Sequence, residues 1–145
     1  MSRQPQASTI DHIARDCIAV RMRMLNRMIT NLYDEALRPL GVKESQMNIL
    51  VAAAKLGLAR PGQVCEILQL DASTLSRNVE RMRARGWLEI VPGEDARAQP
   101  FRLTPAGKKL LERTIPAWEK GQSRAVTFLG ADGMALLGKA MTKVR

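Results

Sequence analysis

The sequence predicts a mainly α-helical fold that carries one small β-hairpin. Apolar residues recur at helical spacing over most of the chain, as Leu75, Val79 and Met82 do after the helix cap Asp71. Gly86 is then placed to end that helix. The apolar stretch 87–91, the turn-rich loop PGEDARAQP and the stretch 101–103 follow, and they read as two strands of a hairpin. A helix followed by a basic-tipped hairpin is the outline of a winged helix.

The first expected element is one long helix from about Ile10 to Leu37, because this stretch contains neither Gly nor Pro. Its apolar residues cover more than the single stripe that is expected for a helix with one side exposed to solvent. We therefore expect the helix to pack against two bodies, its own domain and something else. Pro39-Leu40-Gly41 should break it.

Two short helices should follow, at about 45–56 and 61–69, with Gly57 ending the first and Pro61 in the first turn of the second. Leu70-Asp71 is then a very short turn into the next helix. Two helices joined in this way, the second with a polar outer face, form a helix-turn-helix.

At roughly 100° per residue, the face opposite the apolar stripe of the helix after Asp71 carries hydroxyls and guanidinium groups. Ser73 and Arg77 point outward, Thr74 and Arg81 flank one side, and Ser76 and Glu80 flank the other. These groups suit base edges and phosphates in a major groove. An ordinary solvated helix face has a similar composition, so the helix alone leaves both interpretations open. Arg97, at the tip of the loop 93–99, favours DNA because it could enter a minor groove.

After the hairpin, Thr104 should cap a helix with Pro105 in its first turn. Pro116 is expected to kink or restart that helix, and the stretch 130–133 to break it before a last helix at about 133–144. The apolar region 110–144, like the first helix, needs a partner surface. We expect a homodimer.

The net charge of +9, from 23 Lys+Arg against 14 Asp+Glu, indicates an anionic partner. Nucleic acid is favoured over membrane, since no run of about 18 apolar residues is present. The N-terminal stretch lacks the apolar core of a signal peptide, so the expected location is the cytoplasm. Five scattered aromatic residues (2 Trp, 1 Tyr, 2 Phe) argue against stacking of single-stranded bases.

Catalytic and metal chemistry are not expected. Cys17 and Cys65 are too few for a disulfide framework, and His12 is the only histidine, so no cofactor, zinc or haem site is predicted. No Gly-rich phosphate loop or nucleophile elbow occurs, and the Glu94/Asp95 pair reads as a solvated turn. The main alternative to DNA binding is a basic helical adaptor that binds protein. A redox role for Cys17 stays open.

Three runs resemble MarR-type regulators, in the family's order and spacing. They are Tyr33-Asp34-x-x-Leu37-x-Pro39-Leu40-Gly41-Val42 with Gln46-x-x-Ile49-Leu50; Asp71-x-Ser73-Thr74-Leu75-Ser76-Arg77-x-Val79-x-Arg81-Met82-x-x-x-Gly86-Trp87-Leu88; and Asp95-x-Arg97-x-x-x-Phe101-x-Leu103-Thr104-x-x-Gly107. The resemblance implies a single domain, 1–145, in which 10–42 and 105–145 are dimerisation helices. The stretch 43–104 would be the winged helix-turn-helix lobe.

The resemblance also implies a transcriptional regulator, usually a repressor released by a small ligand or an oxidant. As a dimer it would bind a pseudo-palindromic operator. It places the recognition helix at 72–86, with Ser73, Thr74, Ser76 and Arg77 facing the groove. Arg97 of the wing would reach the minor groove, oriented by Asp95. The family's usual ligand site is an apolar pocket between the first helix and the DNA-binding lobe, whose residues here the resemblance does not name.

Three features depart from the family pattern. Ala96 and Ala98 stand where many relatives have a further basic residue, and Pro100 stands where a strand normally has a hydrogen-bond donor, so the second strand should start late. Cys17 lacks the tyrosine partners of peroxide-sensing relatives.

Overall fold

A computed structural model describes residues 4–93 and 98–144 of the chain. The helices are α1 (Gln4–Asp16), α2 (Ile18–Leu37), the 3₁₀ turn η1 (Arg38–Leu40), α3 (Glu44–Leu56), α4 (Pro61–Leu68), α5 (Ala72–Ala84) and α6 (Pro105–Met141). The strands are β1 (Leu88–Ile90) and β2 (Phe101–Leu103). The mainly α-helical fold with one small hairpin is therefore confirmed. Asp95 and Arg97, both expected in the wing, lie outside the described residues.

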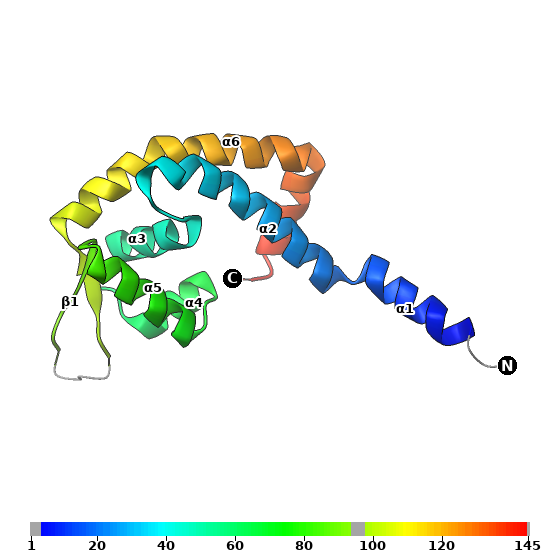
Figure 1. The fold of residues 1–145 in the computed structure, drawn as a ribbon, viewed down its shortest axis with the longest axis horizontal. Helices are drawn as coiled ribbons and strands as arrows, with labels where there is room; N and C mark the ends of the chain where they lie inside the picture. The colour runs from blue at the N-terminus through cyan, green and yellow to red at the C-terminus, as the bar shows by residue number, and fades with distance from the viewer. Residues whose placement is uncertain (1–3, 94–97, 145) are drawn as a thin grey trace.

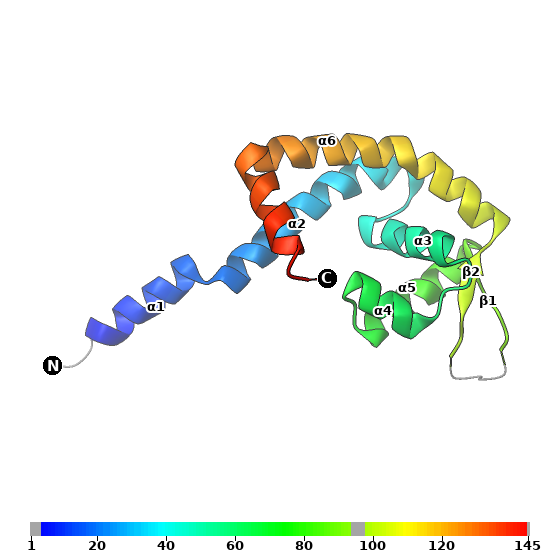
Figure 2. The same ribbon diagram turned by 180° about the vertical axis from the view of Figure 1, so that it is seen from behind.

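The molecule has two layers. Helices α2 and α6 lie side by side, with α3 beneath them and α4, α5 and the hairpin farther away (Figures 1 and 2). The Tyr33 hydroxyl donates a hydrogen bond to Oε1 of Gln122, which joins α2 to α6. Helix α1 extends away from this body, and the last part of α6 folds back toward it (Figure 1).

The hydrophobic core lies between the two layers and inside the lobe. Fully buried side chains from α3, α5 and the hairpin meet there, among them Ile49, Leu75 and Phe101. Leu37 from α2 and Leu110 from α6 join the same cluster. The core therefore holds α5 in place against the rest of the lobe and against the long helices α2 and α6.

The hairpin is short and regular. Leu88, Glu89 and Ile90 pair with Leu103, Arg102 and Phe101 in antiparallel register. Leu88, Phe101 and Leu103 are buried on one face, while Glu89 and Arg102 form an ion pair of 2.6 Å on the other. The second strand begins after Pro100, as expected, and the Pro100 carbonyl accepts from Val91 N at 2.8 Å. Ala59 exchanges two backbone hydrogen bonds with Phe101, which ties the hairpin to the segment before α4.

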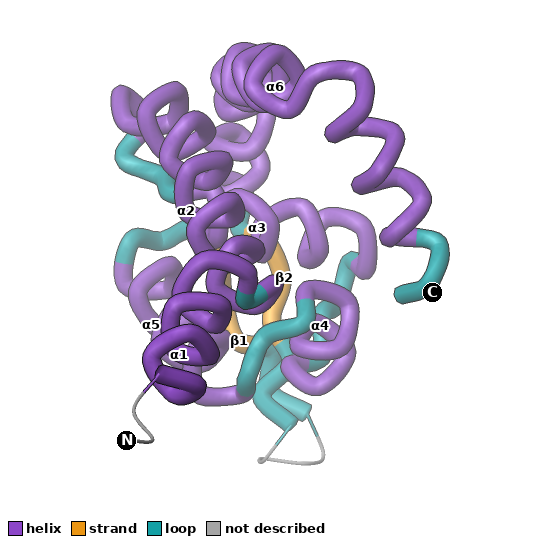
Figure 3. The backbone as a smooth tube through the Cα atoms, turned by 90° about the vertical axis from the view of Figure 1, so that its right-hand side faces the viewer, coloured by secondary structure: helices purple, strands orange, loops and turns teal. Residues whose placement is uncertain are grey.

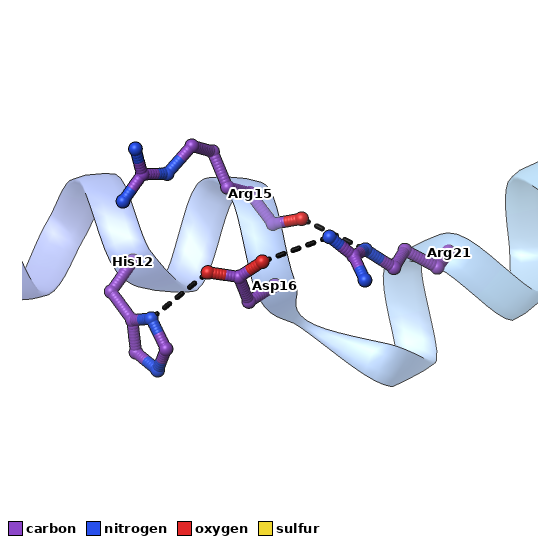
Figure 4. Close-up of polar contacts among 4 residues, drawn as sticks. All are labelled: His12, Arg15, Asp16 and Arg21. Carbon is purple, nitrogen blue, oxygen red and sulfur yellow. Dashed lines mark hydrogen bonds and ion pairs between the residues drawn. The ribbon is translucent and has the colours of Figure 1, made fainter.

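The single helix expected over 10–37 is wrong, because the chain breaks at Cys17. Cys17 has φ −63° and ψ 112°, an extended conformation that cannot continue a helix. Arg21 bridges the break: its Nε donates to the Arg15 carbonyl at 2.9 Å and its Nη2 to Oδ1 of Asp16 at 2.8 Å (Figure 4). His12 Nδ1 lies 3.0 Å from the other carboxylate oxygen of Asp16. The carbonyl freed at the end of α1 is thus satisfied by a side chain.

The expected restart at Pro116 is also wrong, since α6 runs through this residue. The break expected at 130–133 is confirmed at Gly130, whose φ of 67° and ψ of 178° are not helical. Gly130 therefore divides α6 into two helical segments, and the second is the last helix that the sequence predicts.

Candidate nucleic-acid interface

A tight turn joins α4 to α5. Gln69 adopts a left-handed conformation with φ 52°, and its side-chain Nε2 donates to the Glu66 carbonyl at 2.8 Å. Leu70 N donates to the Cys65 carbonyl at 2.9 Å, which closes the end of α4. Asp71 is the last of only three residues that connect α4 to α5. This is the helix-turn-helix that the sequence predicts (Figure 3).

Asp71 caps the N-terminus of α5 with both carboxylate oxygens. Oδ1 accepts from the Ser73 hydroxyl at 2.6 Å and from Thr74 N at 2.8 Å, and Oδ2 accepts from the Thr74 hydroxyl at 2.7 Å. These hydrogen bonds, with a smaller contribution from the positive charge of Arg77, hold the pKa of Asp71 well below its usual range. The cap is therefore a carboxylate at any pH near neutral.

The C-terminus of α5 closes in a Schellman motif. Gly86 has φ 77°, its N donates to the Arg83 carbonyl at 2.9 Å, and Trp87 N donates to the Met82 carbonyl at 3.0 Å. The predicted stop at Gly86 is confirmed, with Ala84 as the last helical residue.

Four of the five recognition-helix residues predicted from sequence, Ser73, Ser76, Arg77 and Arg81, are exposed on the side away from the buried Leu75, Val79 and Met82. The fifth, Thr74, is half-buried. The hydroxyl protons of Ser73 and Thr74 are already donated to Asp71, so these oxygens can still accept a hydrogen bond but have no free donor. The side chains of Ser76, Arg77 and Arg81 make no hydrogen bond or ion pair within the described part of the chain.

The same face holds one acidic residue, Glu80. Its carboxylate pairs with Arg83 at 2.9 Å, and this pairing lowers the pKa of Glu80. Because Arg83 offsets Glu80, the two unpaired guanidinium groups of Arg77 and Arg81 leave the face positive. The hairpin projects beside α5, away from α2 and α6 (Figure 1).

Sequence reasoning missed one residue at this interface, Arg85. It follows the last residue of α5 and donates from Nη1 to the Gly41 carbonyl at 2.6 Å. No local pattern could identify this contact, because it joins residues 44 positions apart.

A hollow of about 620 Å³ lies where α2, the start of α3 and the α4–α5 turn meet. Its lining is Asn26, Thr30, Asp34, Lys43, Glu44, Ser45, Asn48, Leu68, Gln69 and Leu70. The resemblance implied an apolar pocket in this region, whereas this lining is mostly polar. Burial raises the pKa of Glu44, and nearby Asp34 adds to the rise while a hydrogen bond from Asn48 opposes it.

A family model described as "MarR family" matches residues 40–98, which run from the end of η1 through β1 and stop before β2. Over these residues the chain is similar to the MarR family. A curated MarR relative, the multiple antibiotic resistance protein of Salmonella typhimurium, is 29% identical over 91 residues. That alignment covers 62% of this chain and 63% of the relative, so the chain spans less than two-thirds of the length of this relative.

Solved MarR-type structures share the fold. A mutant MarR from E. coli complexed with operator DNA superposes with a TM-score of 0.79 at 24% identity, covering 92% of this chain and 96% of that one. The M. tuberculosis transcriptional regulator MOSR in complex with DNA gives 0.73 at 27% identity, covering 90% and 99%. The winged helix-turn-helix is therefore the fold of this chain.

No helix in residues 4–93 or 98–144 is long and apolar enough to cross a membrane. In the same ranges, no group of three His, Cys, Asp or Glu residues could hold a metal ion.

Proposed function

We propose that this protein is a MarR-type transcription regulator that binds double-stranded DNA in a sequence-specific manner. The observation that carries the proposal is the open face of α5. It presents the side chains of Ser76, Arg77 and Arg81, which make no hydrogen bond or ion pair to the described residues, beside a projecting hairpin in a chain of net charge +9. Phosphates would provide most of the affinity and base edges the choice of sequence. The two solved relatives described above were both crystallised with DNA.

We propose that a second copy of the chain covers the apolar residues left exposed on α2 and α6. Ile18 and Met24 of α2 are 75% and 61% exposed, and Leu136 at the end of α6 is 71% exposed. Large apolar side chains at this exposure on long helices are typical of interaction surfaces. Two copies related by a two-fold axis would present two α5 helices to a pseudo-palindromic operator.

Within the interface we propose distinct roles. Arg77 would read a base edge, while Arg81 and Ser76 flank it on the groove walls. Ser73 and Thr74 would accept hydrogen bonds from base amino groups, since their own protons are held by Asp71. We retain the wing roles implied by the family for residues outside the described ranges: Arg97 entering the minor groove and Asp95 orienting it.

The regulator is proposed to be a repressor that a small effector releases, acting in the cytoplasm where it has access to its operator. The polar hollow supports effector control, because Asp34 of α2 and Leu70 of the turn before Asp71 both line it. A ligand there would touch a dimerisation helix and the start of the recognition helix together.

Selection of binding sites from random duplex DNA tests the proposal. The expected product is a palindromic consensus with half-sites about one helical turn apart. Random duplexes should bind more weakly, with an affinity that falls steeply with salt. A folded protein that enriches no sequence would refute the proposal. The rival protein-binding adaptor would then be the better interpretation.

A further inference from the structure

Arg85 ties the recognition helix to the turn that follows α2. It is the residue after Ala84, the last of α5, and its Nη1 donates to the Gly41 carbonyl at 2.6 Å. Its guanidinium carbon lies 4.4 Å from the centre of the Trp87 ring. A hydrogen bond and an aromatic face thus fix the orientation of one exposed side chain.

Gly41 is suited to this contact in two ways. Its φ of 68° is left-handed, which favours glycine, and an added Cβ would lie 3.3 Å from Nη2 of Arg85. Gly41 N also donates to the Arg38 carbonyl at 3.0 Å, which fixes the turn whose carbonyl receives Arg85.

The end of α5 is also attached to α6. Thr104 N donates to the Trp87 carbonyl at 3.1 Å, and the Thr104 hydroxyl donates to the Gly86 carbonyl at 2.5 Å. A Cβ on Gly107 would lie 2.0 Å from the Trp87 carbonyl oxygen, so α6 approaches the end of α5 as closely as glycine permits. The turn that follows α2 and the start of α6 are therefore both attached to the residues just after α5, while the residues that face DNA begin at the other end of α5.

We infer that Arg85 is a positioning residue that sets the angle of α5 relative to α2 and α6, and thereby the half-site spacing that the dimer accepts. The inference rests on the proposed DNA-binding function. Helix α5 has 13 residues and is about 20 Å long, so a tilt of about 10° at its C-terminal end moves its first turn by about 3–4 Å. One base pair occupies about 3.4 Å of the DNA axis. A change of about 10° in the angle of α5 after loss of the Arg85 contact would therefore correspond to about one base pair of half-site spacing.

The test compares Arg85→Ala, Arg85→Gln and Arg85→Lys with the matched control Arg83→Ala. The control removes one charge from the last turn of the same helix, where Arg83, among the described residues, pairs with Glu80. The probes are the operator selected by the wild-type protein, the same operator with one base pair added or removed between half-sites, and a random duplex. In Arg85→Ala and Arg85→Gln, the preference for the native spacing should fall by about fivefold or more, the range typical of coupling between sites. Arg85→Lys keeps a donor and a cation over the ring and should restore most of that preference. Arg83→Ala should keep the wild-type preference.

Equal weakening on all probes in Arg85→Ala, with a salt dependence lowered by about one ion per subunit, would make Arg85 a phosphate contact and overturn the inference. Unchanged spacing preference in both Arg85→Ala and Arg85→Gln would overturn it as well. Failure of the proposed function is separate, since the wild-type protein would then select no operator.

A DNA-free measurement completes the test. In a Trp118→Phe background, Arg85→Ala should shift the fluorescence emission of Trp87 because the stacked cation is gone, and Arg83→Ala should not. No shift would show that the contact is absent in solution, whatever the result with DNA.

Discussion

Arg77 lies in the second turn of α5, exposed and with no hydrogen bond or ion pair to the described residues. Because its guanidinium contributes to the fold only a minor charge interaction with Asp71, Arg77→Ala should leave the melting temperature nearly unchanged. It should weaken operator binding by about 1–3 kcal/mol per site if Arg77 contacts a guanine edge. Titration of operator and random duplex with both proteins measures the difference. Equal losses on the two DNAs would limit Arg77 to phosphate contact.

Arg97 is the only basic residue between Gly93 and Pro100, so minor-groove contact by the wing depends on it. Arg97→Ala should weaken binding most on operators with A·T-rich flanks, where the groove is narrow and more negative. Asp95→Ala should cause a smaller loss of the same kind if Asp95 orients Arg97. Tighter binding after Asp95→Ala would instead indicate simple relief of charge repulsion.

Asp71 links the stability of α5 to pH. Its folded-state pKa is lowered by hydrogen bonds from Ser73 and Thr74, so its contribution is fully present above the unfolded-state pKa of about 3.9. That contribution is lost as pH falls from there toward the lower folded-state pKa. Asp71→Asn keeps a cap acceptor and should melt close to the wild type at pH 7, but should lose less stability on acidification. Melting curves from pH 7 to 3 decide this, and parallel pH profiles would contradict it.

Among the secondary-structure elements, α5 could be predicted because its signals are local. Asp71 begins it and Gly86 ends it through bonds to residues within five positions. The break at Cys17 could not be predicted, since neither Gly nor Pro marks it and the Arg21 side chain stabilises it from the next helix. The exposed polar side of α5 followed from helical periodicity, whereas the Arg85–Gly41 contact depends on tertiary packing.

Gly121 of α6 shows how closely α2 and α6 pack. A Cβ at this buried position would lie 2.7 Å from Cδ1 and 3.0 Å from Cα of Tyr33. Gly121→Ala should therefore destabilise the protein by about 1–3 kcal/mol, the usual cost of overpacking. Gly62→Ala in α4 is the control, because nothing lies within 4 Å of the added carbon, and alanine there should be neutral or stabilising by up to about 1 kcal/mol. Urea unfolding of both variants tests the difference.

At the scale of the whole molecule, light scattering should give a mass near twice 16.1 kDa. Leu136→Glu places a charge on the exposed apolar end of α6, where burial against a second copy would be costly, and should shift the protein toward monomer. Circular dichroism should show that the variant keeps its helices. A wild-type monomer at micromolar concentration would contradict the proposed dimer.

The pairing of α2 with α6 also affects how the chain acquires its structure during synthesis. The side chains of Tyr33 and Gln122 are joined by a hydrogen bond although 89 positions separate the two residues. At about 5–20 residues per second, a ribosome needs roughly 5–20 s to make that intervening stretch. Helix α2 therefore emerges early, with its isoleucine and methionine side chains uncovered, while the shorter-range contacts of the lobe can form without it. The surface proposed for the second copy is complete only after α6 has been made, so we expect association of two copies to be a late, concentration-dependent step in synthesis.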